Sequence, residues 1–439
     1  MRPSRSDSRS SSAKSSTSTN PERHPAGNID NARSVLIEVM KLFSPRDKLF
    51  PELQAFRRDI HANPEFGFEE TRTARQVAAL LRAFGLDVIT NVGGTGVVGT
   101  LRRGQSTKSI MLRADMDALR IQEAPNAERP YLSKATGLMH ACGHDGHTAM
   151  LLGAAQQLAE RGEFDGTVHF VFQPAEEWGK GMLAMLDDGL LHRFPASEAY
   201  ALHNMPGLAI GKFETCAGAF KAAEDNFTIT VEGKSAHSAR PHWGRDALVA
   251  AAALITALQT IVSRVLTPGE QAVVTCTDIK VAGTRNVSCG EAVISGDCRS
   301  FSPAVSAQIE AEMRRIAESV ALAHGCTAKV TYTREFVPTV NDPALTCAIA
   351  EIIDSEFGAG AVNGNAYPNA GSEDFGQLLQ RIPGCFVNIG NGETAPLHNS
   401  AYDFNDDAIP YGVAFFVAVV HARLPATSRT PSIAYSPLT

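Results

Sequence analysis

The spacing of apolar residues divides the first half of the chain into helices and strands. Apolar residues at helical spacing predict helices over residues 31–43, 50–60 and 146–160. Short apolar runs predict strands over residues 88–91, 97–101, 109–114, 167–172 and 199–203. Because strands alternate with helices, the pattern predicts an open, largely parallel sheet with its functional site at the strand ends.

A second pattern begins near residue 215. It predicts a strand, a helix, two strands, a helix and a strand over residues 225–232, 246–265, 272–281, 291–298, 303–324 and 327–333. This β-α-β-β-α-β order is a ferredoxin-like unit that is complete in itself, so we expect an inserted α+β domain over residues 215–334.

The chain then returns to helical patterns over residues 343–357, 372–380 and 406–423, with a strand over 385–389. Residues 31–214 and 335–424 are therefore expected to form one domain on either side of the insert. The Ser/Arg-rich residues 1–30 lack apolar periodicity and are expected to be a disordered tail. Residues 425–439 are expected to form a C-terminal tail.

Composition narrows the class of protein. The chain has 439 residues, of which 44% are hydrophobic, and this length suits two folded units. Its net charge of -7 argues against a nucleic-acid-binding surface. The longest apolar runs are too short to span a membrane, so we expect no membrane partner. The eight cysteines form no CxxC pair, which favours reduced thiols and a cytoplasmic protein.

One glycine pattern resembles a nucleotide-binding motif. Gly94, Gly96 and Gly99 spell GxGxxG, which binds dinucleotides where a helix follows. Here a strand-like run follows, so the glycines predict a hairpin between two strands.

The densest chemistry lies between His140 and His147, where three imidazoles, a thiol and a carboxylate share eight residues. On an extended chain His140, Cys142 and His144 would point the same way, and a thiolate beside imidazoles is typical of a transition-metal site. The alternative is a polar turn that caps the following helix. A cap needs one Asp or Ser, so this density of ligands favours the metal site.

Acids and imidazoles also follow four predicted strands. These residues are Asp115 and Asp117, Glu176 and Glu177, His203, and His398. Any one of them alone is more often a surface or core residue than a ligand. Together they favour a common site at the edge of the sheet.

These stretches resemble the hippurate hydrolase, aminoacylase and auxin-conjugate amidohydrolase branch of the dinuclear-zinc peptidases, which also include the glutamate carboxypeptidases. The matching segments are residues 60–70, 112–119, 140–147, 173–177, 233–242, 371–375 and 397–399, in family order. The resemblance implies an α/β catalytic domain with a central mixed sheet flanked by helices, plus an inserted ferredoxin-like lid and dimerisation domain. The sequence departs from the family pattern at Arg120, at residues 178–182 and at residues 286–289, which affects the substrate pocket more than the reaction.

The resemblance also implies roles for individual residues. It implies two divalent metal ions (Zn, Mn, Co or Ni) held by Cys142, His144, Glu177, His203 and His398. Glu176 would be the general base, and Asp117 an outer carboxylate that orients a ligand imidazole. His237 would reach the active site of a partner subunit and donate a hydrogen bond to the oxyanion. Asn286 and Arg299 would hold the carboxylate and carbonyl of the substrate.

The resemblance implies metal-dependent hydrolysis of the amide bond of N-acyl (acetyl, aromatic acyl or similar) amino acids by a homodimer or dimer-based oligomer. Hydrolysis would release a carboxylic acid and a free amino acid, while the acyl group stays open. Two alternatives remain: a dipeptidase or carboxypeptidase of the same family, which would accept free-amine substrates, and a non-catalytic metal- or ligand-binding homologue.

Overall fold

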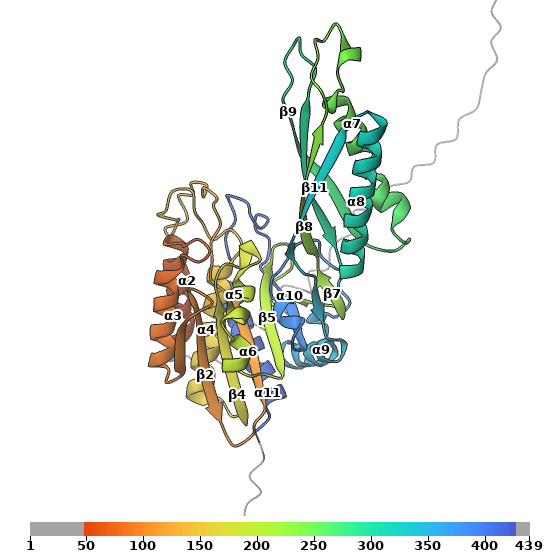
Figure 1. The fold of residues 1–439 in the computed structure, drawn as a ribbon. Helices are drawn as coiled ribbons and strands as arrows, with labels where there is room; N and C mark the ends of the chain where they lie inside the picture. Colours follow the sequence, from red (N-terminus) through yellow and green to blue (C-terminus); the bar gives the residue numbers. More distant parts are fainter. Residues whose placement is uncertain (1–47, 427–439) are drawn as a thin grey trace, which may run out of the picture.

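The computed structural model describes residues 48–426, which form a helix-flanked body and a narrower second body that extends from it (Figure 1). The predicted helix over 31–43 lies outside the described residues, as do residues 1–30 and 427–439 of the predicted tails. In the described part of the chain, no helix combines the length and the apolar character that crossing a membrane requires.

The larger body is built on an eight-stranded sheet with the order β1-β2-β4-β3-β5-β14-β6-β13. Its strands are β1 (Asp87–Val92), β2 (Gly96–Arg103), β3 (Ser109–Asp115), β4 (Gly166–Gln173), β5 (Glu198–Met205), β6 (Phe213–Glu214), β13 (Val362–Asn363) and β14 (Gly384–Gly390). The neighbours β4, β3, β5 and β14 run parallel. In contrast, β1 pairs antiparallel with β2, β2 with β4, and β14 with β6.

The prediction of a largely parallel sheet is therefore wrong outside its centre, and the sheet is mixed, as the resemblance implied. The physical reason is the short turn over residues 93–95, because so few residues can only return the chain antiparallel to β1. The same turn confirms that the glycines between β1 and β2 belong to a hairpin. Gly93 and Gly94 both have positive φ, which glycine adopts without steric cost.

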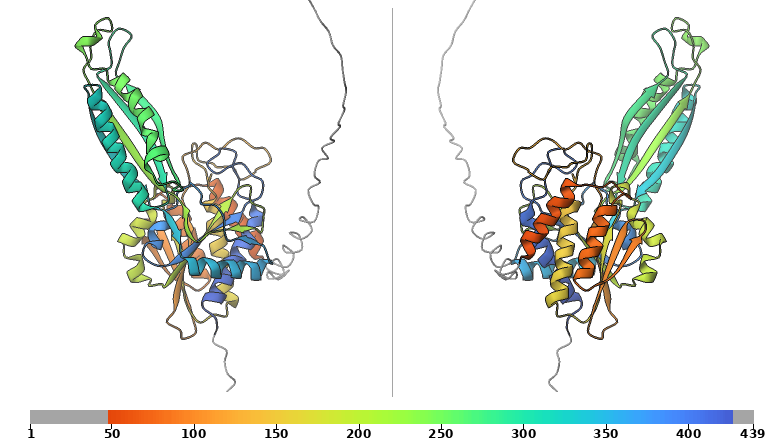
Figure 2. Two further views of the ribbon diagram at one scale, coloured as in Figure 1. Left: turned by 90° about the vertical axis from the view of Figure 1, so that its right-hand side faces the viewer. Right: turned by 90° about the vertical axis from the view of Figure 1, so that its left-hand side faces the viewer.

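Alternating strand residues face two layers of helices. Ile110 and Leu112 of β3 pack into the core under α2 (Leu49–Ala62), α3 (Thr71–Ala83), α4 (His144–Arg161), α9 (Pro343–Phe357) and α11 (Ile409–Arg423). Met111 faces the opposite layer of α5 (Gly181–Asp187), α6 (Leu190–Arg193) and α10 (Gly376–Leu379). Figure 2 shows α2, α3 and α4 along one face. Helix α10 covers only residues 376–379 of the range 372–380 for which the sequence predicted a helix.

The second body is a four-stranded antiparallel sheet with two helices. Its strands are β8 (Ala223–Glu232), β9 (Ala272–Val281), β10 (Glu291–Ser300) and β11 (Thr327–Phe336), in the order β11-β8-β10-β9. Helices α7 (Ala247–Leu258) and α8 (Pro303–Ala323) pack on it through a separate apolar core. This confirms the predicted β-α-β-β-α-β order, although the helix predicted over 246–265 breaks after Leu258 and a π-helical turn over Ile261–Val265 follows.

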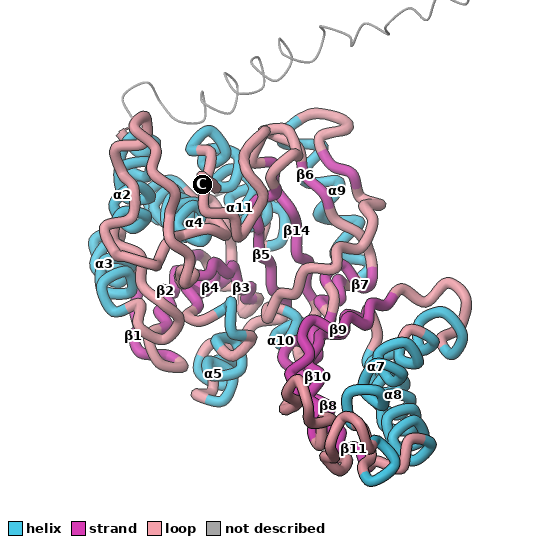
Figure 3. Tube along the Cα trace, turned by 90° about the horizontal axis from the view of Figure 1, so that it is seen from above, coloured by secondary structure: helices cyan, strands magenta, loops and turns pink. Residues whose placement is uncertain are grey.

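The two bodies are joined by a small sheet. Its strands β7 (Gly218–Lys221) and β12 (Thr339–Asn341) pair antiparallel on the two chain segments that enter and leave the second body. Seen from above, the second body projects to one side of the larger sheet (Figure 3).

Candidate metal centre

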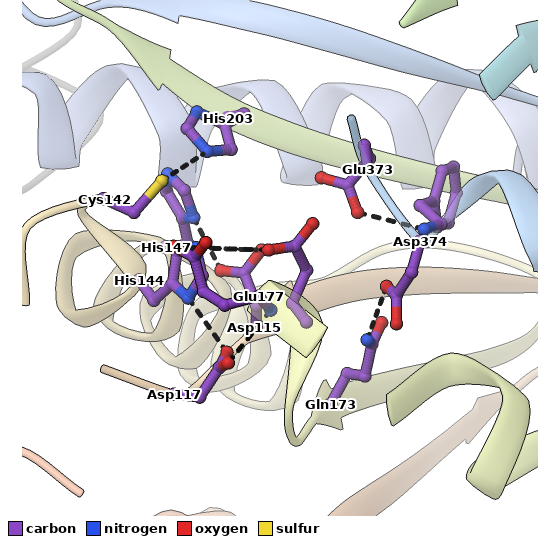
Figure 4. Close-up of polar contacts among 12 residues, drawn as sticks. Asp115, Asp117, Cys142, His144, His147, Gln173, Glu177, His203, Glu373 and Asp374 are labelled. Atoms are coloured by element: carbon purple, nitrogen blue, oxygen red, sulfur yellow. Dashed lines mark hydrogen bonds and ion pairs between the residues drawn. The ribbon is translucent and has the colours of Figure 1, made fainter. Parts of the chain in front are cut away.

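The polar residues that follow the central strands converge at the carboxyl ends of these strands (Figure 4). Asp115 ends β3, Glu176 and Glu177 form a short 3-10 turn after β4, and His203 lies near the end of β5. His144 begins α4 beside them. Parallel neighbouring strands bring these ends together, as the sequence predicted.

The five predicted ligands form two overlapping groups. Ligand atoms of Cys142, His144 and His203 lie within 4.8 Å of one another, and so do those of Cys142, Glu177 and His398. Cys142 Sγ lies 3.3 Å from His203 Nε2, and His398 Nε2 lies 3.4 Å from Glu177 Oε1. Cys142 belongs to both groups, so it could contribute a ligand to each of two ions.

The chemistry of the groups fits divalent metal ions. His144 Nε2 is buried and has no hydrogen-bond partner among the described residues. Coordination to a metal ion would satisfy this nitrogen. Burial alone would lower the pKa of His144, but Asp115 and Asp117 outweigh it and raise the pKa to about 10. Burial together with Glu177 and Glu176 raises the pKa of the Cys142 thiol. The site therefore carries a strongly negative field, which favours cations.

Asp117 connects two of these ligands. Its Oδ1 lies 3.0 Å from His144 Nδ1, and its Oδ2 accepts a hydrogen bond of 3.1 Å from the Glu177 backbone N–H. The contact with His144 Nδ1 orients the imidazole ring so that its Nε2 is available to a metal ion. The hydrogen bond from the Glu177 N–H fixes the turn that carries Glu177. This geometry suits the outer carboxylate that the resemblance implied.

Glu176 lies beside the ligands in a buried acidic group. Its carboxylate oxygen lies within 4.8 Å of those of Glu373 and Asp374. Burial, and then the charge of Glu373, raises the pKa of Glu176 well above its usual value. Ala175 has a φ of 48°, and this left-handed residue turns the chain between β4 and the two glutamates. A carboxylate with a raised pKa holds a proton more tightly than an ordinary carboxylate does.

Three buried residues around the site, Arg113, Glu373 and Asp374, were not singled out from the sequence, and the contacts of Asp115 and His147 were not predicted. His147 Nδ1 lies 2.6 Å from Asp115 Oδ1, and Arg113 forms ion pairs with Asp115, Glu373 and Asp374. All five lie inside segments that match the family pattern, but their position in a segment does not reveal a contact across the fold. These contacts form only when β3 packs against α4 and against the loop over residues 371–375.

His140 does not point with Cys142 and His144 as expected. No candidate metal group in residues 48–426 contains it, and its buried ring lies 6.3 Å from that of His61. The expectation assumed an extended chain, whereas Gly143 has a φ of 92° and α4 already begins at His144.

The predicted residues of the second body, His237, Asn286 and Arg299, belong to none of the ligand groups found in residues 48–426. His237 is exposed and its backbone bridges to Val287, while the Ser238 N–H donates to the Asn286 carbonyl oxygen. Arg299 lies on β10 and is already paired with Glu224 at 2.6 Å and with Asp297 at 2.9 Å. It also donates to Ser372 Oγ, next to Glu373.

Comparison with known proteins points to one family. The model of peptidase family M20/M25/M40 matches residues 111–422. A hippurate hydrolase of Campylobacter jejuni is 37% identical over 365 residues, which cover 83% of this chain and 94% of the relative. An N-acetyl-L-cysteine deacetylase of Bacillus subtilis is 36% identical over 359 residues, which cover 82% of this chain and 85% of the relative. A solved Bacillus subtilis structure, described as a dinuclear metal-binding peptidase from family M20, gives a TM-score of 0.75 at 31% identity, covering 85% of this chain and 97% of that chain.

Proposed function

Because the chain belongs to peptidase family M20/M25/M40, we propose that it hydrolyses the amide bond of N-acyl amino acids and releases a carboxylic acid and a free amino acid. The observation that carries this function is the pair of ligand groups that share Cys142, with Glu176 beside them. Relatives named for hydrolysis of hippurate and of N-acetylcysteine cover most of the chain.

The cofactor is a pair of divalent metal ions. Cys142, His144 and His203 would hold one ion, and Cys142, Glu177 and His398 the other. When bound, such ions polarise the scissile carbonyl and lower the pKa of water. We propose zinc, manganese, cobalt or nickel as the ion. Thiolate and imidazole ligands suit zinc, cobalt and nickel better than magnesium or calcium, and the carboxylate of Glu177 also suits manganese.

Glu176 is the proposed general base. It would accept a proton from the attacking water and pass it to the nitrogen of the leaving amino acid. Its buried position beside Glu177 supports this assignment, and its raised pKa makes it a better proton acceptor than an ordinary carboxylate.

We also propose a homodimer that forms through the second body. Strand β9 is an edge strand, and it exposes Val273, Ile279 and Val281 by 43%, 39% and 45%. An exposed apolar edge favours pairing with a second strand. In such a dimer His237 would enter the partner subunit's metal centre and donate to the oxyanion. Asn286 and Arg299 remain the predicted contacts to the carboxylate and carbonyl of the substrate. A cytoplasmic location also remains a prediction.

A substrate panel tests the proposed function. Protein loaded with zinc or manganese is incubated with N-benzoylglycine, N-acetylcysteine and dipeptides, and free amino acids are measured by mass spectrometry. We expect release from the N-acyl compounds that stops after chelation. Release from free-amine dipeptides alone would favour the dipeptidase alternative, and metal-dependent release from none of them would exclude the proposal.

A further inference from the structure

Lys221 is a buried cation that no step described above uses. It ends β7, where the two bodies join, and only 6% of its surface is exposed. Its Nζ lies 5.5 Å from the ring centroids of Phe220 and Phe386. Among the described residues, Nζ has no hydrogen bond or ion pair. Burial of an ammonium group without such partners is costly, which makes this residue a candidate for ligand binding.

The surroundings of Lys221 place it beside the metal centre. The ring of Phe386, over which its ammonium lies, is 6.4 Å from the ring of His203. Burial lowers the pKa of Lys221, and the acidic groups of Glu373, Cys142 and Glu176 oppose this effect. In turn Lys221 contributes to the lowered pKa of His203. Its charge therefore acts on the space where the substrate would lie.

Two other cationic side chains near Glu373, those of Arg113 and Arg299, already form ion pairs with carboxylates. Arg113 is fully buried and paired with Asp115, Glu373 and Asp374. Arg299, which the sequence suggested as a carboxylate ligand, is paired with Glu224 and Asp297 on its own sheet. A guanidinium group held by two carboxylates would have to give up one of them to bind a third. Of these three cations, only Lys221 has its donors unassigned.

We propose that Lys221 binds the carboxylate of the N-acyl amino acid and is thus a specificity-determining residue. This inference rests on the proposed function, because it takes the substrate to be an acyl amino acid. The ammonium would donate charge-assisted hydrogen bonds to the carboxylate, which are stronger than neutral ones. The site then selects substrates with a free carboxylate over the corresponding amides.

Binding measurements test the proposal separately from turnover. Metal-loaded Glu176→Ala protein is titrated by calorimetry with N-benzoylglycine and with N-benzoylglycinamide, which lacks the charge. Adding Lys221→Met is expected to raise the Kd for N-benzoylglycine by about 10- to 100-fold, the range of a lost charge-assisted hydrogen bond, and to leave the Kd for the amide within about twofold. Turnover of N-benzoylglycine by the unmodified protein tests the proposed function by itself.

Three further variants complete the test. Lys180→Met removes an exposed cation near Glu177 and is expected to keep the preference for the carboxylate. Lys221→Gln provides a second variant of similar length if Lys221→Met does not fold. The proposal is overturned if Lys221→Met or Lys221→Gln weakens both ligands equally. It is also overturned if Arg299→Met, rather than a change at Lys221, abolishes the preference.

Discussion

At the scale of single residues, the adjacent acids Glu176 and Glu177 divide two roles. Glu177 groups with Cys142 and His398, whereas Glu176 groups with Glu373 and Asp374. We expect Glu176→Ala to lower kcat by about 10²- to 10⁴-fold, the usual contribution of a general base, and to retain bound metal. Cys142→Ala is expected to lose metal, because it removes a ligand from both groups. Metal content by mass spectrometry and kcat on N-benzoylglycine check both, and loss of metal from Glu176→Ala would refute the assignment.

His61 makes stability depend on pH. Burial alone would lower its pKa, but hydrogen bonds to Asp145 and Glu123 outweigh burial and raise the pKa to about 9. The folded protein therefore holds a proton that the unfolded chain releases near pH 6.5. This stabilisation, at most about 3 kcal/mol, is complete below pH 6.5 and is lost as the pH rises through 9.

The matched variant for this effect is His61→Gln. The free energies of unfolding of wild type and variant, measured from pH 6 to pH 10, are expected to differ most at pH 6 and to converge above pH 9. A constant difference across this range would mean that packing, rather than the charge of His61, explains the effect.

The sequence indicated the ligands better than their surroundings. Cys142 and His144 stand out because ligand types are crowded within a few residues, whereas Glu177 stands out as one of two adjacent acids after a predicted strand. The exclusion of His140 depends on the backbone of Gly143, and the pairing of Arg113 with Glu373 joins strands and loops that are distant in the chain. Composition and spacing do not encode such contacts, because they arise only when the elements pack.

At the scale of elements, helix α4 carries the proposed ligand His144 and packs closely against its neighbours. A Cβ atom built on Gly153 would lie 2.5 Å from Leu53 of α2 and 2.6 Å from Val413 of α11. Gly153→Val would thus force both helices apart. We expect it to destabilise the protein by about 1–3 kcal/mol, the usual effect of overpacking, and to lower the midpoint of thermal unfolding.

The control for this prediction lies on the same helix. Glu160→Ala changes an exposed residue of α4 and is expected to alter stability by less than about 0.5 kcal/mol. Equal unfolding midpoints for Gly153→Val and wild type would show that α2 and α11 can move away without loss.

Elements with strong periodicity were predictable, and their pairing was less so. The β-α-β-β-α-β order of the second body follows from alternating strands and two long amphipathic helices. The antiparallel placement of β2 beside β4 was not predicted. Alternation of apolar and polar residues indicates which face of a strand is buried, but it does not identify the neighbouring strand. The helix expected over 372–380 is short because Glu373 and Asp374 turn inward to Arg113.

At the scale of the whole molecule, the second body carries His237 and Asn286, and the ligand groups found in residues 48–426 do not contain them. Their loops are joined by the bond from the Ser238 N–H to the Asn286 carbonyl oxygen, so they would move as one unit. Sequence patterns describe one chain, and the residues that a second copy contributes leave no periodic signal. The proposed dimer therefore requires a test that distinguishes action within a subunit from action between subunits.

Mixing two inactive variants supplies that test. Co-expressed Glu176→Ala and His237→Ala chains form mixed dimers, in which the centre with an intact Glu176 faces the partner's His237. If His237 acts between subunits, random pairing is expected to restore about a quarter of wild-type activity, since half of the dimers are mixed and each has one complete centre. If His237 acts within its own subunit, every centre lacks one residue and the mixture stays inactive. Sedimentation of the same sample checks that dimers are present. Ile279→Lys places a charge on the exposed strand β9 and is expected to abolish both the dimer and the restored activity.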